Sequence, residues 1–405
     1  MRLKDVAFVN LRTLDESTKG DYKFRYIDIS SVSADNGITL GDEITFQEAP
    51  SRARRIVKKD DVLVSTVRTY LRAIANIDWD AKDIIASTGF AVYTPNNKII
   101  PRFLAYSIKS TKAINQICSN SKGVSYPAIQ AQVLSSIEIP YWDLKRQEAI
   151  AAYLDKECEK IGRKIELLER KADAYSRLRR SLINRAVTRG LDPNKTFKTS
   201  QSSICTEIPS HWQEKRIKDI FTEKSIKGYP NEPMLCATQS KGVIPQSLYE
   251  NRVVTAVSGL ENMKLVDVGN FVISLRSFQG GIEYAYYRGI ISAAYTILEL
   301  DTNNSHDYFR HFFKSLSLIK LMKKCVTGIR DGQNINYTTL KYEHIPVPPI
   351  EEQKEIAAYL DEKCAKIDAI LEKINTEVER LKELKRSLIN EVVTGQRAID
   401  TESRS

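Results

Sequence analysis

The chain has 405 residues, of which 42% are hydrophobic and 28% are charged. This length exceeds the size at which one hydrophobic core usually keeps growing, and the composition excludes a disordered or fibrous chain. The formal charge of +10 favours a polyanionic partner such as nucleic acid. No stretch approaches the roughly 18 apolar residues of a membrane helix, and no cysteine or histidine group has metal-ligand spacing. We therefore expect a cytoplasmic protein with reduced thiols, no membrane association and no bound metal.

Residues 1–143 are predicted to form a first domain of ordinary size. Runs of β-branched and aromatic residues, such as 62–68 and 90–93, predict short strands. Residues 102–117 have apolar side chains at helical spacing, and a polar loop with a glycine follows at 119–126. The segment is therefore expected to be a strand-rich α/β unit.

Basic and polar side chains of this segment are candidates for contact with nucleic acid. Arginine and lysine bind phosphates and guanine edges, and loop hydroxyls supply further donors and acceptors. A plain surface turn has a similar composition, so the loop residues fit both interpretations. The candidates in this segment are Arg52, Arg54, Arg55, Lys58, Arg68, Lys122, Ser125 and Tyr126.

A long helix is predicted at 144–189, because this part of the chain is repeated without a gap. Residues 147–188 match 353–394 at a constant offset of 206, and a loop would have tolerated insertions. Proline and acidic residues near the start of each copy favour a helix N-terminus there. The second helix is predicted at 346–395, followed by a tail at 396–405.

Apolar residues in both copies recur at alternating steps of four and three, which is typical of a coiled-coil seam. The obvious partner of each helix is the other copy, and pairing requires the two helices to run antiparallel. The alternative is that each stripe packs onto its own globular domain. The predicted seam residues are Ile161, Ile165, Leu168, Tyr175, Leu178 and Leu182 in the first copy, and Ile367, Leu371, Ile374, Val378, Leu381, Leu384 and Leu388 in the second.

Residues 190–207 are rich in serine, threonine and lysine and are interpreted as a flexible linker between domains. Residues 208–345 form the second predicted domain, which repeats the order of the first: strands, a short amphipathic helix at 308–322, and a polar glycine loop at 327–334. The nucleic-acid candidates of this half are Arg276, Arg330, Gln333 and Asn334.

The first long helix is unusually basic over residues 163–189, with nine Lys or Arg against three acids. The matching stretch 369–395 of the second helix is balanced at five against five, so coiled-coil pairing does not require the excess. This stretch is expected either to face DNA or an acidic partner, or to be a solvated helix face.

The sequence lacks the common motifs for catalysis and cofactor binding. The sequence contains no Gly-x-x-x-x-Gly-Lys-Ser/Thr, no Gly-x-Gly-x-x-Gly and no Asn/Asp-Pro-Pro-Tyr, which excludes the usual signatures for ATP and for adenine methylation. Two Glu-x-Lys sequences lie on the long helices, where flanking charges are expected. We therefore expect a protein without catalytic residues and without a bound cofactor.

The pattern resembles the specificity subunit of Type I restriction-modification systems over essentially the whole length. The strongest match is the entry into the second helix, residues 345–361, and the start of the second half at 208–212 is also similar. The first copy of the helix entry, at 139–147, lacks the double proline. The resemblance implies an α+β fold: two α/β target-recognition domains in a pseudo-two-fold repeat, separated by two long antiparallel coiled-coil helices.

The same resemblance implies that each half binds one part of a bipartite double-stranded DNA target. Separate methyltransferase subunits, two of them, and in some systems restriction subunits, would supply the chemistry. Two other functions are open on the residues alone: a stand-alone DNA-modifying enzyme, which would need a catalytic motif, and a coiled-coil scaffold, which would leave both globular halves without a role.

Overall fold

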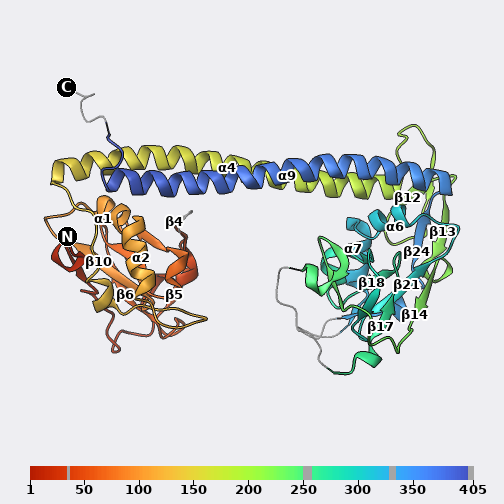
Figure 1. The fold of residues 1–405 in the computed structure, drawn as a ribbon, viewed down its shortest axis with the longest axis horizontal. Helices are drawn as coiled ribbons and strands as arrows, with labels where there is room; N and C mark the ends of the chain where they lie inside the picture. Colours follow the sequence, from red (N-terminus) through yellow and green to blue (C-terminus); the bar gives the residue numbers. More distant parts are fainter. Residues whose placement is uncertain (34–36, 250–257, 328–333, 400–405) are drawn as a thin grey trace. The chain divides into compact units, whose positions relative to one another are not determined.

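The computed structural model describes residues 1–33, 37–249, 258–327 and 334–399. The chain divides into two compact units, Met1–Arg170 with Ile374–Ser405 (unit 1) and Lys171–Lys373 (unit 2). Two long helices, α4 (Leu144–Arg189) and α9 (Ile350–Val393), each contribute one part to both units. Figure 1 shows the two helices with the strands of each unit.

Unit 1 contains two four-stranded sheets. The first is antiparallel with the order β1 (Ala7–Val9), β10 (Phe90–Pro95), β7 (Val62–Ser65) and β8 (Ile74–Asn76). The second has the order β5 (Glu43–Thr45), β2 (Lys23–Ile27), β9 (Ile84–Ser87) and β6 (Ala53–Val57), with β2 parallel to β9. The remaining elements are the β3–β4 hairpin strands (Val32–Ser33 and Gly37–Ile38), α1 (Pro101–Ile108), α2 (Thr111–Ser119), α3 (Ala131–Leu134) and three 3-10 turns (Leu3–Asp5, Ile29–Ser31 and Thr69–Leu71).

Unit 2 repeats the first sheet with the same topology. Its order is β14 (Phe221–Lys224), β21 (Thr296–Leu300), β18 (Phe271–Ile273) and β19 (Glu283–Tyr284). The two-stranded pairs among its described residues are β11 (Phe197–Thr199) with β12 (Glu207–Pro209), β13 (Gln213–Arg216) with β24 (His344–Val347), β15 (Leu235–Thr238) with β16 (Gly242–Pro245), β17 (Lys264–Val266) with β20 (Gly289–Ile291), and β22 (Val326–Thr327) with β23 (Asn334–Ile335). Its helices are α5 (Ser277–Gly280), α6 (His306–Phe312), α7 (Leu316–Lys324) and α8 (Tyr337–Leu340), with 3-10 turns at Ile217–Asp219, Gln246–Leu248 and Leu260–Asn262.

The helix parts pair antiparallel inside each unit. In unit 1 the Lys164 ammonium lies 2.9 Å from the Glu377 carboxylate, while residues near the start of α4 pack against residues near the end of α9. In unit 2 the Arg179 guanidinium lies 2.9 Å from Asp368. The seam is buried in the middle of the helices, at Ile165, Ile367, Ile374, Val378, Leu381 and Leu388, and half-buried at Ile161, Leu168, Tyr175, Leu182 and Leu371.

Two predicted seam residues are not buried, because the apolar stripe changes partner near the end of each helix. Leu178 is 46% exposed and Leu384 is 49% exposed. The stripe continues instead through residues that pack on the globular part of the same unit, as in the alternative considered for the sequence. These are Ile183, Ala186 and Val187 in unit 2, and Ile389, Val392 and Val393 in unit 1.

The same contacts join helix to domain in both units, at the offset seen in the sequence. The buried Gln147 accepts a hydrogen bond from the Ile100 N–H at 2.8 Å, and the buried Gln353 accepts one from Ser305 N–H at the same distance. Asn390 caps α2 through the Thr111 N–H, as Asn184 binds the Ser317 N–H at the start of α7. Repeated joints of this kind fix each domain on its own part of the helices.

Two boundaries differ from the sequence prediction. The second helix begins at Ile350 and not at 346, because Pro346 belongs to β24 and pairs with Glu214 of β13. The segment 190–207 is not a flexible linker. It forms β11 and the start of β12, buries Ile204, and is anchored by hydrogen bonds from Ser200 and Ser202 to Glu214.

Candidate nucleic-acid interface

The turn between β7 and β8 in unit 1 is held in an uncommon backbone conformation. Arg68 and Arg72 stand at the two ends of the 3-10 turn Thr69–Leu71 with φ of +49° and +54°. Left-handed conformations are rare for residues other than glycine, and they cluster at functional sites because the surrounding structure must maintain them. Tyr70 and Leu71 between them are 55% and 51% exposed.

A second loop, which follows α2, holds this turn in place. The Arg68 N–H donates to the Pro127 carbonyl at 2.7 Å, and the Thr69 and Ser121 hydroxyls lie 2.8 Å apart. Val67 and Lys122 each form a β-bridge to Ala128. Residues more than fifty positions apart in the sequence thus form one surface.

The Arg68 guanidinium lies over the ring of Tyr126, 4.6 Å from its centroid, and Tyr126 is 65% exposed. Stacking on an aromatic ring orients the plane of a guanidinium and leaves its edge N–H groups available for guanine or phosphate. We call this surface, made of Arg68, Lys122, Ser125 and Tyr126, the Arg68 platform. The structure places four of the predicted nucleic-acid candidates on it.

The basic candidates of β6 are divided by the structure. Arg52, which directly precedes β6, accepts a hydrogen bond at its carbonyl from the Thr88 N–H. The next residue, Gly89, accepts one from the Thr66 N–H, two residues before Arg68. Arg52 therefore lies at the same end of the sheets as the platform. Lys58 directly follows β6, beyond the other end of that strand.

Arg54 and Arg55 are engaged within unit 1. The Arg54 guanidinium lies over Phe46, 4.8 Å from the ring centroid, and donates to the Ala53 carbonyl. Arg55 binds the Thr13 hydroxyl at 3.3 Å and is half-buried, which lowers its pKa. These contacts separate Arg54 and Arg55 from the platform.

Unit 2 has equivalents of both loops. Arg276 follows β18 as Arg68 follows β7, and it is exposed. The second loop joins β22 to β23, and α8 follows it at the position of α3 plus 206. Asn334 is exposed at the start of β23, whereas Arg330 and Gln333 lie outside the described residues.

The basic stretch of α4 is largely matched by acids. Six of its nine cations have a carboxylate partner, so most of the excess seen in the sequence does not form an open positive patch. Three pairs lie within α4, two reach α9 and one reaches Glu207. The pairs are Arg163–Glu159, Arg170–Glu166, Arg177–Asp173, Lys164–Glu377, Arg179–Asp368 and Arg189–Glu207.

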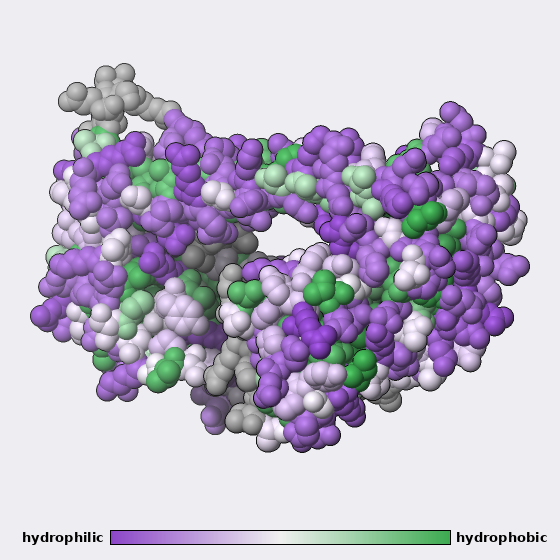
Figure 2. Space-filling model, turned by 45° about the vertical axis from the view of Figure 1, so that its right-hand side comes forward, coloured by the Kyte–Doolittle hydropathy of each residue, from purple (hydrophilic) through white to green (hydrophobic). Residues whose placement is uncertain are grey.

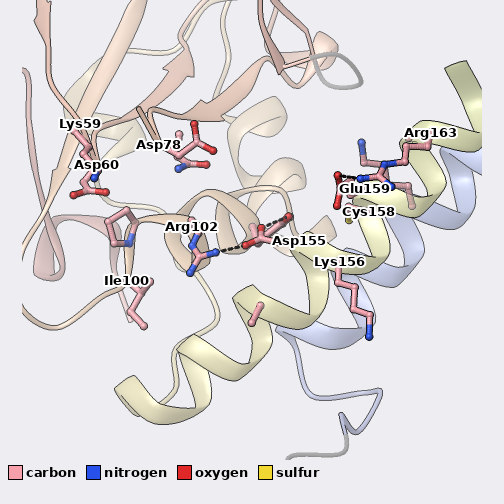
Figure 3. A pocket seen from close by; sticks show the side chains of 16 residues that line it. Lys59, Asp60, Asp78, Ile100, Arg102, Asp155, Lys156, Cys158, Glu159 and Arg163 are labelled. Carbon is pink, nitrogen blue, oxygen red and sulfur yellow. Dashed lines mark hydrogen bonds and ion pairs between the residues drawn. The ribbon is translucent and has the colours of Figure 1, made fainter. Parts of the chain in front are cut away.

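Each unit has a cleft between its globular part and its helix part. Two neighbouring clefts of about 1110 and 560 Å³ lie in unit 1, and one of about 840 Å³ lies in unit 2. In the largest, Arg102 of α1 reaches Asp155 of α4, and Glu159 binds Arg163 (Figure 3). Hydrophilic residues cover most of the face seen in Figure 2, with small hydrophobic patches between them.

Two aspartates at the same repeat position, which the sequence motifs did not single out, join a long helix to the domain in each unit. Asp155 accepts from Arg102 and from the Tyr106 hydroxyl, and Asp361, at the same repeat position, accepts from Arg310 and His311. Burial lowers the pKa of His311, although Asp361 acts in the opposite direction. Their identical place in the two repeats was the signal that could have identified them.

The described ranges contain no group of three or more His, Cys, Asp or Glu side chains arranged to hold a metal ion. Within those ranges, none of the helices is both long and apolar enough to span a membrane.

Comparison with known proteins places this architecture. The family model for the Type I restriction modification DNA specificity domain matches residues 1–171 and 209–380. The putative type I restriction enzyme MjaX specificity subunit of Methanocaldococcus jannaschii is 25% identical, with 88% of this chain and 82% of that protein covered. The type I restriction enzyme EcoKI specificity subunit of Escherichia coli is 23% identical, with 75% of this chain and 67% of that protein covered.

A solved chain from a type I R-M system, in a study of complex assembly and conformational transition, has the same fold. The TM-score is 0.69 at 21% identity, over 98% of this chain and 97% of that one. The predicted mixed α+β class with two target-recognition domains and long helices is thereby confirmed. The chain belongs to the family of Type I restriction-modification DNA specificity subunits.

Proposed function

We propose that each unit of this specificity subunit reads one part of a bipartite duplex target, and that the Arg68 platform and the Arg276 turn supply base contacts. The observation that carries the proposal is the Arg68 guanidinium stacked on the exposed Tyr126 ring, on a turn held by two left-handed residues. An oriented guanidinium suits bidentate binding of guanine in the major groove.

The chain itself contributes no catalysis in this proposal and binds no cofactor. Methyl transfer comes from separate methyltransferase subunits, and cleavage, where it occurs, from restriction subunits, all in the cytoplasm. The support is the lack of ATP and adenine-methylation signatures in the sequence.

Two methyltransferase subunits are proposed, because the helix surface is duplicated. Leu178 and Leu384 occupy the same repeat position, and both are about half exposed. An exposed apolar side chain that recurs at the repeat offset fits two copies of one partner, each meeting the same surface.

The test combines purified chain with methyltransferase subunits and maps methylated adenines on DNA. The chain alone is expected to transfer no labelled methyl group, and the complex is expected to methylate a bipartite site. Arg68→Ala should relax one half-site only, and Arg276→Ala the other. Methyl transfer by the isolated chain, or loss of discrimination in both half-sites from either variant, would contradict the proposal.

Stoichiometry is tested separately by measuring the mass of the complex. Leu178→Lys and Leu384→Lys should each remove one methyltransferase subunit, and the double variant should remove both. Leu167→Lys is the control, since Leu167 is 64% exposed on α4 without an equivalent apolar residue at 373. Full occupancy in the double variant would contradict the assignment of this surface.

A further inference from the structure

The smaller cleft of unit 1 has a lining suited to a nucleotide. Its volume is about 560 Å³, and it is lined by aromatic rings and by cations from three different parts of the chain. The rings are Tyr70, Trp79 and Tyr106, and the cations are Arg72, Lys109, Lys382, Lys385 and Arg386. Aromatic surface beside cations is the combination that proteins use for nucleic-acid strands, since the rings face bases and the cations face phosphates.

The cleft of unit 2 is built at the same repeat positions and shows what differs. There, Arg179 pairs with Asp368 at 2.9 Å, and Lys314 pairs with the buried Glu283 at 2.6 Å. Both carboxylates line that cleft. Two cations of unit 2 are therefore neutralised from within the protein.

Both of these acids are replaced in unit 1. The repeat offset of 206 relates Asp368 of unit 2 to Gly162 of unit 1. The same offset relates Arg179 of unit 2 to Lys385 of unit 1. Glu283 pairs with Val272 in the β18–β19 ladder, and Ala75 pairs with Leu63 in the equivalent β7–β8 ladder. Unit 1 thus keeps the cation at 385 but has glycine and alanine where unit 2 has carboxylates.

The acids that remain in the unit 1 cleft stand elsewhere. Glu379 pairs with Lys382 at 3.1 Å on α9 itself, and Asp78 lies on the sheet side. Among the described residues, no carboxylate lies within ion-pair distance of Lys385 or Arg72. A cation without a protein partner at an open cleft is suited to an anion from outside.

One 3-10 turn contributes residues to both the cleft and the Arg68 platform. Arg68 faces Tyr126 at one end of the 3-10 turn, whereas Tyr70, Leu71 and Arg72, from the rest of the same turn, line the cleft. Arg68 and Arg72 are the two ends of one short turn, so a DNA strand that contacts the platform would pass near Arg72.

We propose that this cleft binds a backbone phosphate of the DNA strand read by unit 1, through Lys385 and Arg72, and that unit 2 lacks an equivalent contact. The inference rests on the proposed DNA reading by unit 1. It makes the two units unequal: unit 1 has a sequence-independent anchor in its cleft, whereas Arg179, the counterpart of Lys385 in unit 2, is paired with Asp368.

Gly162→Asp is the sharpest variant, because it gives unit 1 the acid that unit 2 has at this position. A side chain at Gly162 meets nothing within 4 Å, and the position is inside α4, where replacing glycine favours the helix. Gly162→Asn is the matched control of similar shape without charge. Lys385→Ala removes the cation directly, and Lys373→Ala removes an exposed lysine elsewhere on α9.

The assay measures the affinity of the chain assembled with methyltransferase subunits for a short duplex carrying its mapped site, as a function of salt. Losing one phosphate contact should reduce the slope of log K against log salt by about 0.9, so the ratio of wild-type to variant affinity falls about 3-fold between 50 and 200 mM salt. Gly162→Asp, Lys385→Ala and Arg72→Ala should show this change while methylating the same site. Gly162→Asn and Lys373→Ala should match the wild type.

The outcomes separate the possibilities. An unchanged slope in Gly162→Asp and Lys385→Ala, with specific binding intact, overturns the cleft assignment alone. Absence of specific binding by the wild-type complex overturns the proposed function as well. A second arm titrates AMP and ATP without DNA: binding that Lys385→Ala abolishes, together with an unchanged DNA slope, would assign the cleft to a free nucleotide and refute the DNA phosphate.

Discussion

Replacing Gln147 by leucine should loosen unit 1 while leaving unit 2 unchanged. The Gln147 side chain is fully buried and makes three hydrogen bonds: it accepts from the Ile100 N–H at 2.8 Å and donates to the carbonyls of Lys98 at 3.0 Å and Trp142 at 2.7 Å. Each such bond contributes about 0.5–1.5 kcal/mol net, so the three together contribute roughly 1.5–4.5 kcal/mol. Leucine has a similar size but leaves all three backbone groups without a partner.

Amide hydrogen exchange followed peptide by peptide measures this effect without assuming that the whole chain unfolds together. Exchange over α1 and the start of α4 should become about 10- to 1000-fold faster, since each 1.4 kcal/mol corresponds to a tenfold change. Gln353→Leu is the mirror control, because Gln353 makes the equivalent bonds to Ser305, Asn304 and Pro348. Its effect should be confined to α6 and the start of α9. Equal changes in both units from either variant would refute the independence of the two joints.

Three further predictions concern charge and recognition. Burial raises the pKa of Glu283 to about 6, against the opposing effect of Lys314. Because a raised pKa in the folded state favours the protonated form, the stability of unit 2 should fall as pH rises from about 4.5 through about 6. At pH 8 the Glu283→Gln variant should therefore be about 2 kcal/mol more stable than the wild type. Thermal unfolding at pH 5 and pH 8 checks this, and a larger gain at pH 5 would contradict it. Arg68→Ala should cost about 1–3 kcal/mol of discrimination at one base position, seen as extra methylated variants of one half-site in genome-wide mapping; an unchanged set of sites would remove Arg68 from the base contacts. Tyr126→Ala should reproduce part of that loss, since the ring orients the guanidinium, whereas Tyr126→Phe, which keeps the ring, should retain the wild-type sites.

The internal repeat was the most informative feature of the sequence, because it predicted both long helices. An offset of 206 without a gap identified the long helices, and the same offset relates Gln147 to Gln353 and Asn184 to Asn390 in the structure. The heptad pattern could not distinguish a partner helix from a domain surface, because both bury the same spacing of apolar side chains. Leu178 and Leu384 were assigned to the seam for that reason.

The candidate site was harder to predict, since it depends on contacts between distant loops. Nothing in the local sequence indicates that Arg68 stacks on Tyr126, or that Thr69 meets Ser121. The basic run in β6 looked like one cluster, yet strand geometry and the bulge between Ala53 and Arg55 direct its side chains to different surroundings. The serine-rich segment 190–207 looked flexible by composition, but it forms β11 and buries Ile204.

Because unit 1 combines residues 1–170 with residues 374–399, its two parts are synthesised at different times. Residues 1–170 are synthesised before unit 2, but Leu388, Ile389, Val392 and Val393, which complete the core around Ile150 and Leu154, are synthesised after it. At about 5–20 residues per second, that interval is on the order of 10 to 40 seconds. During it, all of unit 2 emerges and can fold, while the apolar face of the first helix has no covering partner. The nascent chain therefore exposes this face until α9 has been synthesised, and deletion of α9 would leave the core of unit 1 incomplete even though every residue of its globular part is present.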